Sequence, residues 1–405
     1  MSFGIALSGI NAAQSDLNVT ANNIANSNTN GFKQSRSEFA ELFAVSPQGV
    51  SKAQTGAGVK ISDVATQFTQ GNIEATNNSL DLALSGQGFF ILSDNGASAY
   101  TRAGAFQTDN SGYVTNAEGQ RLQVYQPTLG GAFNTTSLTD LRLVTGDSAP
   151  QATSNANIVF NLASNATPPA VAVFDPANNN SYNSSTSLTI YDSLGAAHTA
   201  SMYFVKTATA NTWDTHMYID GVAVGGAQTL QYTSTGALAV PNPAKITFPA
   251  YPPGTGALDI NLTVDYSSTT QYGNTFGVTA VSQDGFTTGR LIGISVGSTG
   301  VVQARFTNGR SVSLGQVAIA SFANPQGLQP LGNTNWSETF NSGQALHGQA
   351  GNSGFGLIQS GSLEQSNVDI TAQLVNMITA QRSFQANAQV ISTENQLTQA
   401  IINIR

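Results

Sequence analysis

Apolar residues recur every seven positions at the start of the chain, and this spacing constrains the fold more than any other feature. Phe3, Ile10, Leu17 and Ile24 follow it, with alanines beside them on the same face. A seven-residue apolar repeat is typical of a helix whose stripe packs against another helix. The first 26 residues are therefore predicted to form a helix that needs a partner.

The end of the chain carries a second stripe of the same kind. Ser366, with Asp369 three residues later, predicts a capping box and hence a helix over residues 367–404. That helix would be about 55 Å long, and such a rod cannot bury its own stripe. The apolar positions of the stripe follow a spacing of three or four and continue after a small drift: Ile370, Leu374, Met377, Phe384, Ala388, Ile391, Leu397, Ile401 and Ile404.

Charge and composition exclude several classes of protein. Only 9% of the 405 residues are charged, against about 25% in an ordinary soluble domain. The net charge of −8 and the mere 14 Lys and Arg residues argue against nucleic-acid binding, because phosphates are recognised by clustered cations. The absence of cysteine rules out disulfides and thiolate metal sites. We find no cleavable secretory signal and no apolar run that approaches a membrane span, so we expect no membrane insertion.

Between the two ends the pattern changes to short alternating runs. Residues 80–125 and 285–323 predict antiparallel strands and hairpins, with turns at Asn95-Gly96, Glu118-Gly119 and Asn308-Gly309. Residues 146–284 contain neither Glu nor Arg, and their alternation predicts a β-sandwich or barrel-like insert. The predicted fold is mainly β with long helical termini: a coiled-coil-like helical domain, a discontinuous β domain, and an outer β domain inserted into it.

The residues that could carry catalysis form no recognisable site. His198, His216 and His347 are scattered and have no ligand-type spacing, so we expect neither a metal site nor a catalytic role. Asp192 near His198 is better explained as a turn aspartate beside an edge-strand histidine. The glycine-rich stretches at 85–90 and 348–356 lack the ending of a phosphate loop and are expected to form turns. We predict no enzyme and no cofactor.

Amides take the place of charges around both predicted helices. Residues 363–405 contain five charged residues, while glutamines fill many other positions, and asparagines crowd the end of the first helix. An amphipathic helix usually covers the core of its own domain, and that alternative stays open. Amides can meet amides of neighbouring chains without the desolvation cost of ions, which favours helices whose second faces contact other subunits.

Two segments at opposite ends carry a family resemblance. "NNIANSNTNGFK" at 22–33 resembles the N-terminal signature of the bacterial flagellar rod, hook and hook-associated proteins. "LVNMITAQRSFQANAQVIST" at 374–393 resembles their C-terminal signature, and "SGSLEQSNVDI" at 360–370 resembles the segment that leads into it. Interior matches include "LDLALSGQGFFIL" at 80–92 and "YTRAGAF" at 100–106.

The resemblance, with the chain length and one large β insert, implies a subunit of the flagellar hook. The hook is an extracellular, flexible, self-assembling tube that joins the rod to the filament and transmits torque. The implied partners are copies of the chain, the rod, the hook cap, the hook–filament junction proteins and the flagellar type III export apparatus. Two alternatives stay open: a distal rod subunit of the basal body, and a surface adhesin or glycan-binding β protein.

The resemblance also implies a division of labour along the chain. Residues 1–27 and 366–405 would form an inner tube, residues 28–70 a linking segment, residues 71–145 and 285–365 the discontinuous β domain, and residues 146–284 the outer insert. The asparagines before Gly31 would end the helix, turn the chain and bridge subunits. The residues expected to make contacts between subunits are Phe3, Ile10, Leu17, Asn22, Asn23, Ile24, Asn26, Gly31, Phe32, Ile370, Leu374, Met377, Phe384, Ile391, Leu397, Ile401 and Ile404.

Overall fold

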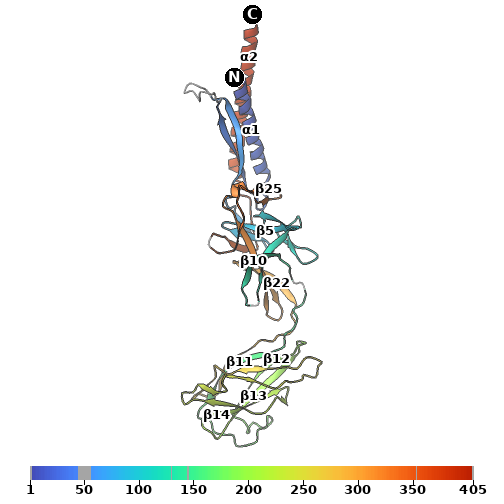
Figure 1. Ribbon diagram of the computed structural model, residues 1–405, viewed down its shortest axis with the longest axis vertical. Coiled ribbons are helices and arrows are strands. Elements are labelled where there is room, and N and C mark those ends of the chain that lie inside the picture. Colours follow the sequence, from blue (N-terminus) through green and yellow to red (C-terminus); the bar gives the residue numbers. More distant parts are fainter. Residues whose placement is uncertain (1, 44–55, 129, 144–145, 353, 404–405) are drawn as a thin grey trace. The chain divides into compact units, whose positions relative to one another are not determined.

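The computed structural model describes residues 2–43, 56–128, 130–143, 146–352 and 354–403. The chain divides into two compact units, which are described separately (Figure 1). The first unit comprises residues 1–145, 293–305 and 311–405, and the second comprises residues 146–292 and 306–310. The first unit therefore contains both termini and is interrupted in sequence by the second.

The first unit combines two helices with the strands on either side of the interruption. The helices are α1 (Ser2–Ala25) and α2 (Ile370–Asn403). A short 3-10 helix, η1, spans Pro325–Gly327. The strands are β1 (Ser35–Leu42), β2 (Gly58–Thr66), β3 (Ile73–Ala75), β4 (Leu82–Ser85), β5 (Phe89–Asp94), β6 (Ala97–Thr101), β7 (Gln107–Thr108), β8 (Val114–Thr115), β9 (Arg121–Pro127), β10 (Phe133–Asp140), β22 (Leu291–Val296), β23 (Val301–Phe306), β24 (Ser311–Ser321), β25 (Gln329–Gly332), β26 (Asn335–Ser337), β27 (Leu346–Gln349), β28 (Leu357–Ser360) and β29 (Ser362–Glu364).

Strands from before and after the interruption share one sheet. β24 pairs antiparallel with both β9 and β5, and β26 pairs with β6. β28 and β4 also join the two halves, in a separate two-stranded sheet. Phe90 and Leu122 from the first half are buried in the same cluster as Val317 and Ile319 from the second. The expected discontinuous β domain is therefore confirmed as a feature of the fold. Asn95 and Gly96 both have positive φ between β5 and β6, as a tight hairpin turn requires.

The start of α2 differs from the predicted capping box. Asp369, and not Ser366, caps the helix: its carboxylate accepts the backbone N–H groups of Thr371 at 2.8 Å and Ala372 at 3.1 Å. Ser366 instead accepts the N–H of Val368, outside the helix. A carboxylate at the N-cap satisfies free N–H groups and also interacts favourably with the helix dipole, so the helix begins at Ile370.

The second unit is a sandwich of two sheets around one core. Its strands are β11 (Asn155–Ala163), β12 (Ser184–Tyr191), β13 (Ala197–Lys206), β14 (Thr212–Ile219), β15 (Val222–Ala223), β16 (Gln228–Tyr232), β17 (Leu238–Val240), β18 (Lys245–Thr247), β19 (Thr263–Asp265), β20 (Thr270–Tyr272) and β21 (Gly277–Gln283). One sheet runs β18-β19-β11-β20 with β21 beside β11, and the other runs β12-β13-β14-β16-β17 with β15 beside β14.

Alternation along the strands explains the packing of the sandwich. On β13, Ala200, Met202 and Phe204 point into the core, and on β14 Trp213 and Met217 join them, as their common parity predicted. The chain enters and leaves the unit side by side, because Ser148 bridges Gly289 and Gln151 bridges Phe286 in antiparallel fashion. The unit is thus a self-contained insertion whose two ends are adjacent.

A histidine between two aspartates ties three loops of the sandwich together. His198 lies on β13, an inner strand between β12 and β14, so the expectation of an edge-strand histidine was wrong. His198 Nδ1 lies 2.5 Å from Asp220 Oδ2, and its Nε2 lies 3.4 Å from Asp192 Oδ2. Thr255 donates to the same Asp192 oxygen at 3.1 Å. Burial alone would lower the pKa of His198, but hydrogen bonds to Asp220 and Asp192 and their charges outweigh it and raise the pKa. Burial raises the pKa of both aspartates, but backbone N–H groups and His198 lower it further than burial raises it.

We expect the second unit to lose stability as the pH rises above neutrality. The pKa of His198 is higher in the folded than in the unfolded chain, so its stabilisation is complete below the unfolded value of 6.5 and lost as the pH rises through the folded value. The lowered pKa values of Asp192 and Asp220 stabilise above 3.8 and cease to do so as the pH falls through the folded values.

Thermal melting followed by Trp213 fluorescence, with Trp336→Phe removing the other tryptophan, measures this dependence. The melting temperature should be higher at pH 6 than at pH 9, and His198→Asn should flatten the difference. A wild-type unit that melts equally at both pH values would show that the histidine is neutral in the fold.

Candidate assembly site

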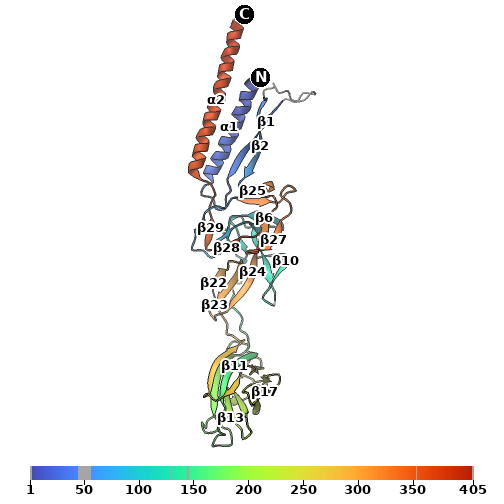
Figure 2. The ribbon, with the colours of Figure 1, turned by 90° about the vertical axis from the view of Figure 1, so that its left-hand side faces the viewer.

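The two helices pair antiparallel. At one end Asn23 Nδ2 donates to Gln373 Oε1 at 3.2 Å, and at the other end a Cβ on Gly9 would lie only 2.6 Å from Asn387 Oδ1. Figure 2 shows α1 and α2 side by side with both chain ends toward the same side of the pair. A side chain at position 9 would therefore displace the Asn387 side chain from this contact.

Small residues form the face through which the helices approach. Ala6, Ala13 and Thr20, which are themselves seven residues apart, are buried on α1, and Ala380 is buried on α2. The larger apolar residues lie at the edges of this contact or outside it. Ile10, Leu17, Ile24, Met377, Phe384 and Ile391 are half-buried, whereas Phe3, Ile370, Leu374 and Leu397 are exposed; Ile404 and the side chain of Ile401 lie outside the described residues.

The hairpin of β1 and β2 packs against α1. Ser8 Oγ accepts the N–H of Val59 at 3.1 Å, and a Cβ on Gly58, where φ is +116°, would lie 2.3 Å from that oxygen. Near the other end of α1, Asn23 holds Ser35 by both backbone groups, accepting its N–H at 2.9 Å and donating to its carbonyl at 2.8 Å. The hairpin is thereby fixed at two points along the helix.

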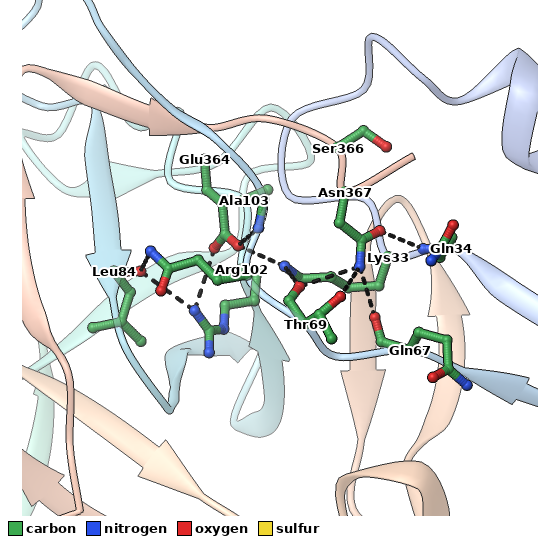
Figure 3. A network of polar contacts seen from close by, with 12 residues as sticks. Lys33, Gln34, Gln67, Thr69, Leu84, Arg102, Ala103, Glu364, Ser366 and Asn367 are labelled. Atoms are coloured by element: carbon green, nitrogen blue, oxygen red, sulfur yellow. Dashed lines mark hydrogen bonds and ion pairs between the residues drawn. The ribbon is translucent and has the colours of Figure 1, made fainter. Parts of the chain in front are cut away.

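Amide side chains continue this connection into the segment before α2. Gln373 Nε2 donates to Gln34 Oε1 at 3.2 Å, and Gln34 N–H donates to Asn367 Oδ1 at 2.8 Å. Asn367 in turn donates to the carbonyl oxygens of Gln67 and Thr69 at 2.8 and 3.1 Å (Figure 3). The amides that seemed excessive in the sequence thus hold three separate segments together.

A buried ionic cluster lies beside these amides. Glu364 Oε1 is 2.5 Å from Lys33 Nζ, and Glu364 Oε2 is 3.3 Å from Arg102 Nη1 (Figure 3). The side chains of Lys33 and Glu364 are completely buried, and that of Arg102 is 5% exposed. We call these three residues the ionic junction, because they join the end of the α1 segment, the β domain and the approach to α2.

Backbone groups also hydrogen-bond to the side chains of the junction. Lys33 Nζ donates to the carbonyl of Thr69 at 2.8 Å, and Arg102 Nη2 donates to that of Gly86 at 2.8 Å. Gly71 N–H donates to Glu364 Oε1 at 2.8 Å. Burial lowers the pKa of Lys33 and of Arg102, and the charge of Glu364 offsets part of that effect. A cation buried here without Glu364 would be strongly unfavourable.

Glycine allows the chain to pass close to this cluster. Gly31 has a φ of +70° and donates its N–H to the carbonyl of Glu364 at 2.8 Å, and a Cβ there would lie 2.4 Å from Ala103 N. The asparagine-rich turn therefore needs glycine for two reasons, a left-handed backbone and a close contact.

The same turn lines a groove that we call the Asn22–Trp336 groove. It has a volume of 560 Å³ and lies between the end of α1, the β1–β2 hairpin and the β25–β26 hairpin. Asn22, exposed, and Asn26, half-buried, stand at this groove, whereas Asn23 is buried against α2. The groove is lined by Asn22, Asn26, Thr29, Phe32, Lys33, Ser35, Val64, Thr66, Pro330, Gly332, Asn333, Thr334, Asn335 and Trp336.

Sequence reasoning missed the ionic junction. Lys33 and Glu364 are 331 positions apart, and nothing local connects them. The one available signal was the position of lone charges inside two otherwise uncharged terminal motifs, "NGFK" and "GSLEQSN". Within the described residues no group of His, Asp or Glu is arranged to hold a metal ion, and no helix is long and apolar enough to cross a membrane.

Four family descriptions match the chain in succession. They are "Flagella basal body rod protein" over residues 3–33, "Flagellar hook protein FlgE/F/G D1 domain" over 83–159, "Flagellar basal body protein FlaE D2 domain" over 161–286, and "Flagellar basal body rod FlgEFG protein C-terminal" over 359–404. Paired terminal helices, a discontinuous β domain and an inserted sandwich, with these matches, define an axial protein of the bacterial flagellum.

Similarity to full-length relatives identifies the family of the chain. The chain is 36% identical to the flagellar hook protein FlgE of Escherichia coli strain K12 over the whole of both chains, and 34% identical to that of Borreliella burgdorferi over 98% of both. The crystal structure of Helicobacter pylori flagellar hook protein FlgE2 shares the fold, with a TM-score of 0.56 at 15% identity over 72% of this chain and all of that one. The chain belongs to the flagellar hook protein family.

It is therefore a hook subunit, a non-enzymatic structural protein of the extracellular flagellum that polymerises with copies of itself. The prediction of a hook subunit is confirmed. Neither a distal rod subunit nor a glycan-binding surface protein accounts for full-length similarity to hook proteins.

Removal of the Glu364 charge should disrupt the ionic junction and destabilise the first unit. Glu364→Gln keeps the shape of the side chain but leaves Lys33 and Arg102 buried without a counter-ion, and we expect a loss of about 3–5 kcal/mol in the free energy of unfolding. Urea unfolding followed by Trp336 fluorescence, in a Trp213→Phe background, measures it. Glu38→Gln, which breaks the exposed pair with Arg36, is the matched control and should change stability by less than about 1 kcal/mol. Equal effects of the two substitutions would contradict this account.

Proposed function

We propose that copies of the chain build the hook through the outer faces of α1 and α2 and through the Asn22–Trp336 groove. In this proposal the terminal helices, within residues 1–27 and 366–405, form the inner wall of the tube. Residues 28–70 link that wall to the β domain of residues 71–145 and 285–365, and residues 146–284 form the outer domain. Most of the residues expected from the sequence to contact other subunits belong to these surfaces. The exceptions are Asn23 and Gly31, which are buried within the subunit, and Ile404 and the side chain of Ile401, which lie outside the described residues.

The observation that carries the proposal is the exposure of large apolar side chains on the helix pair. The buried apolar residues of α1 and α2 are small, whereas several of the larger apolar residues stay in solvent. The most exposed of these on α2 include Val375 at 58%, Ile378 at 50% and Leu397 at 56%. Exposed large apolar side chains along both helices favour a surface that another protein covers, and the hook family is self-polymerising.

The helices also differ in length in a way that leaves one end unpaired. With Asn23 beside Gln373 and Gly9 beside Asn387, Ser2 falls opposite about residue 394. The remainder of α2 to Asn403, including Leu397 and Ile402, has no α1 residue beside it. In this proposal neighbouring copies cover this end of α2, because a lone amphipathic helix is poorly stable in water.

The chemistry of these faces suits a polymer that bends. The two helices contain only three charged residues, Asp16, Arg382 and Glu394, among their 58 positions. Apolar and amide contacts have many nearly equivalent pairings, whereas ion pairs favour one register. Subunits joined by such contacts can shift slightly against one another as the hook rotates. Torque passes along the same contacts from the rod to the filament.

The wider set of partners follows from the place of the hook in the flagellum. We propose that the chain is exported by the flagellar type III apparatus and contacts the rod at one end of the hook. During growth it contacts the hook cap, and afterwards the hook–filament junction proteins. The family similarity supports these partners as neighbours of a hook subunit.

Acidic substitutions on the exposed helix faces should prevent assembly without unfolding the subunit. Leu374→Asp and Leu397→Asp each replace a side chain that contributes about 1.5–3 kcal/mol when buried and would place a carboxylate in an apolar contact. We expect normal circular dichroism and no sedimenting tubes. Leu194→Asp, at a leucine of the sandwich that is 61% exposed, is the matched control and should polymerise. Tubes formed by either helix variant would show that its leucine faces solvent in the hook.

Deletion of the sandwich should leave a polymerising protein. Because the chain enters and leaves the second unit through adjacent antiparallel segments, residues 146–284 can be replaced by a short glycine-serine linker without separating the halves of the β domain. Electron microscopy of the purified variant should show tubes, with bending affected more than assembly. If the deletion variant folds and remains monomeric, the outer domain is itself required for assembly.

A further inference from the structure

One aromatic side chain of the first unit is held entirely in solvent. Phe340, between β26 and β27, is 100% exposed. In the part of the chain that the structure describes, no other large apolar side chain is fully exposed; the next are Val173 at 77% and Leu258 at 76%. Single exposed apolar residues are common, so this exposure acquires meaning only from the way the loop is built.

The loop that carries Phe340 is braced from within. Thr339 Oγ1 donates to the carbonyl of Gly327 at 2.5 Å and accepts the N–H groups of Asn341 and Ser342 at 3.1 and 3.2 Å. Ser342 is fully buried, and its hydroxyl donates to the carbonyl of Thr339 at 2.9 Å. A Cβ on Gly327 would lie 2.6 Å from the carbonyl carbon of Asn341, so the loop is also packed tightly.

A rigid loop with an exposed aromatic tip has the properties of a binding anchor. The backbone is already ordered, so little conformational entropy is lost when a partner covers the ring. Aromatic residues dominate the binding energy of many interfaces because a large area is buried at the cost of only two rotatable bonds. Phe340 has no packing role within its own subunit, since its side chain is uncovered.

We propose that Phe340 of one copy inserts into the Asn22–Trp336 groove of a second copy. A polymer made from one chain needs both halves of each head-to-tail contact on the same molecule, a projecting side chain and a recess elsewhere. The groove offers 560 Å³, with Phe32, Val64 and Pro330 to receive a ring and with Asn22 and Asn26 to bind polar groups of the loop. This inference rests on the proposed function, in which the groove is an assembly surface.

Truncation of the ring tests the anchor. Phe340→Ala removes a side chain without contacts in the subunit, so the melting temperature of the monomer should be unchanged. The critical concentration for tube formation should rise about thirty-fold, as for the loss of an interface anchor. Phe340→Leu should recover most of the assembly, and Val173→Ala, at an exposed site of the sandwich, should assemble normally. A Phe340→Ala protein with the wild-type critical concentration would overturn the inference.

Crosslinking tests whether Phe340 lies in the groove of a second copy. Introduced cysteines can pair only with each other, because the natural chain contains no cysteine. In the Phe340→Cys, Asn26→Cys double variant, oxidation of isolated hooks should produce a ladder of linked subunits, and neither single variant should do so. Hooks of the double variant that give only monomers would place Phe340 elsewhere and overturn the inference.

Blocking the groove separates this inference from the proposed function. Val64→Trp fills the groove from a side chain that is 44% exposed and should raise the critical concentration as Phe340→Ala does. If Val64→Trp abolishes tubes and Phe340→Ala does not, the groove is an assembly surface but Phe340 is not the group that it binds. Normal tubes from both variants would remove the groove from the proposed function as well.

Discussion

The fold of the first unit depends on one buried carboxylate shared by two cations. Glu364 binds Lys33 from the segment after α1 and Arg102 from the β domain, and α2 begins shortly after Glu364. None of the three side chains can be buried alone without a cost of several kcal/mol, so the three segments become ordered together. The neighbouring amides of Asn23, Gln373 and Asn367 then fix the helix pair and the hairpin relative to this point.

This arrangement separates two kinds of interaction. Inside the subunit the contacts are ionic or bidentate and have one geometry, as at Glu364 and at Asn23. On the outer faces of the helices the available groups are leucine, isoleucine, valine and amides, which have no single preferred partner. A subunit with a firm interior and adaptable outer faces is suited to a hook whose subunits must keep their fold while their mutual contacts change.

The sequence predicts those features that depend on neighbouring residues. Helices at both ends, the Asn95-Gly96 turn and the core-facing parity of β13 and β14 follow from local periodicity, and the structure has each of them. The contact face of α1 does not follow, because Ala6, Ala13 and Thr20 have little hydrophobic signal beside Phe3 and Ile10. The predicted start of α2 was wrong by three residues. Ser366 and Asp369 both resemble helix caps, and only the path of the backbone decides which of them caps the helix.

The candidate site likewise has a part that the sequence predicts and a part that it does not. The terminal motifs identified the asparagine-rich turn, but not which amides face inward. Asn23 is buried because it faces Gln373 of α2 and Ser35 of the hairpin, while Asn22 and Asn26 line a groove. These partners are distant in sequence, so the motif alone does not predict the difference. An ion pair across 331 positions leaves no local trace in one sequence.

A helical reconstruction of the bent hook, resolved separately for each strand of subunits, tests the central claim most directly. We predict the same separation of Lys33 Nζ and Glu364 Oε1 in every subunit, compressed or extended, while the neighbours of Leu374, Val375 and Leu397 change from one strand to the next. An ionic junction that opens on one side of the bend, or exposed helix faces that remain in solvent throughout the polymer, would contradict the account.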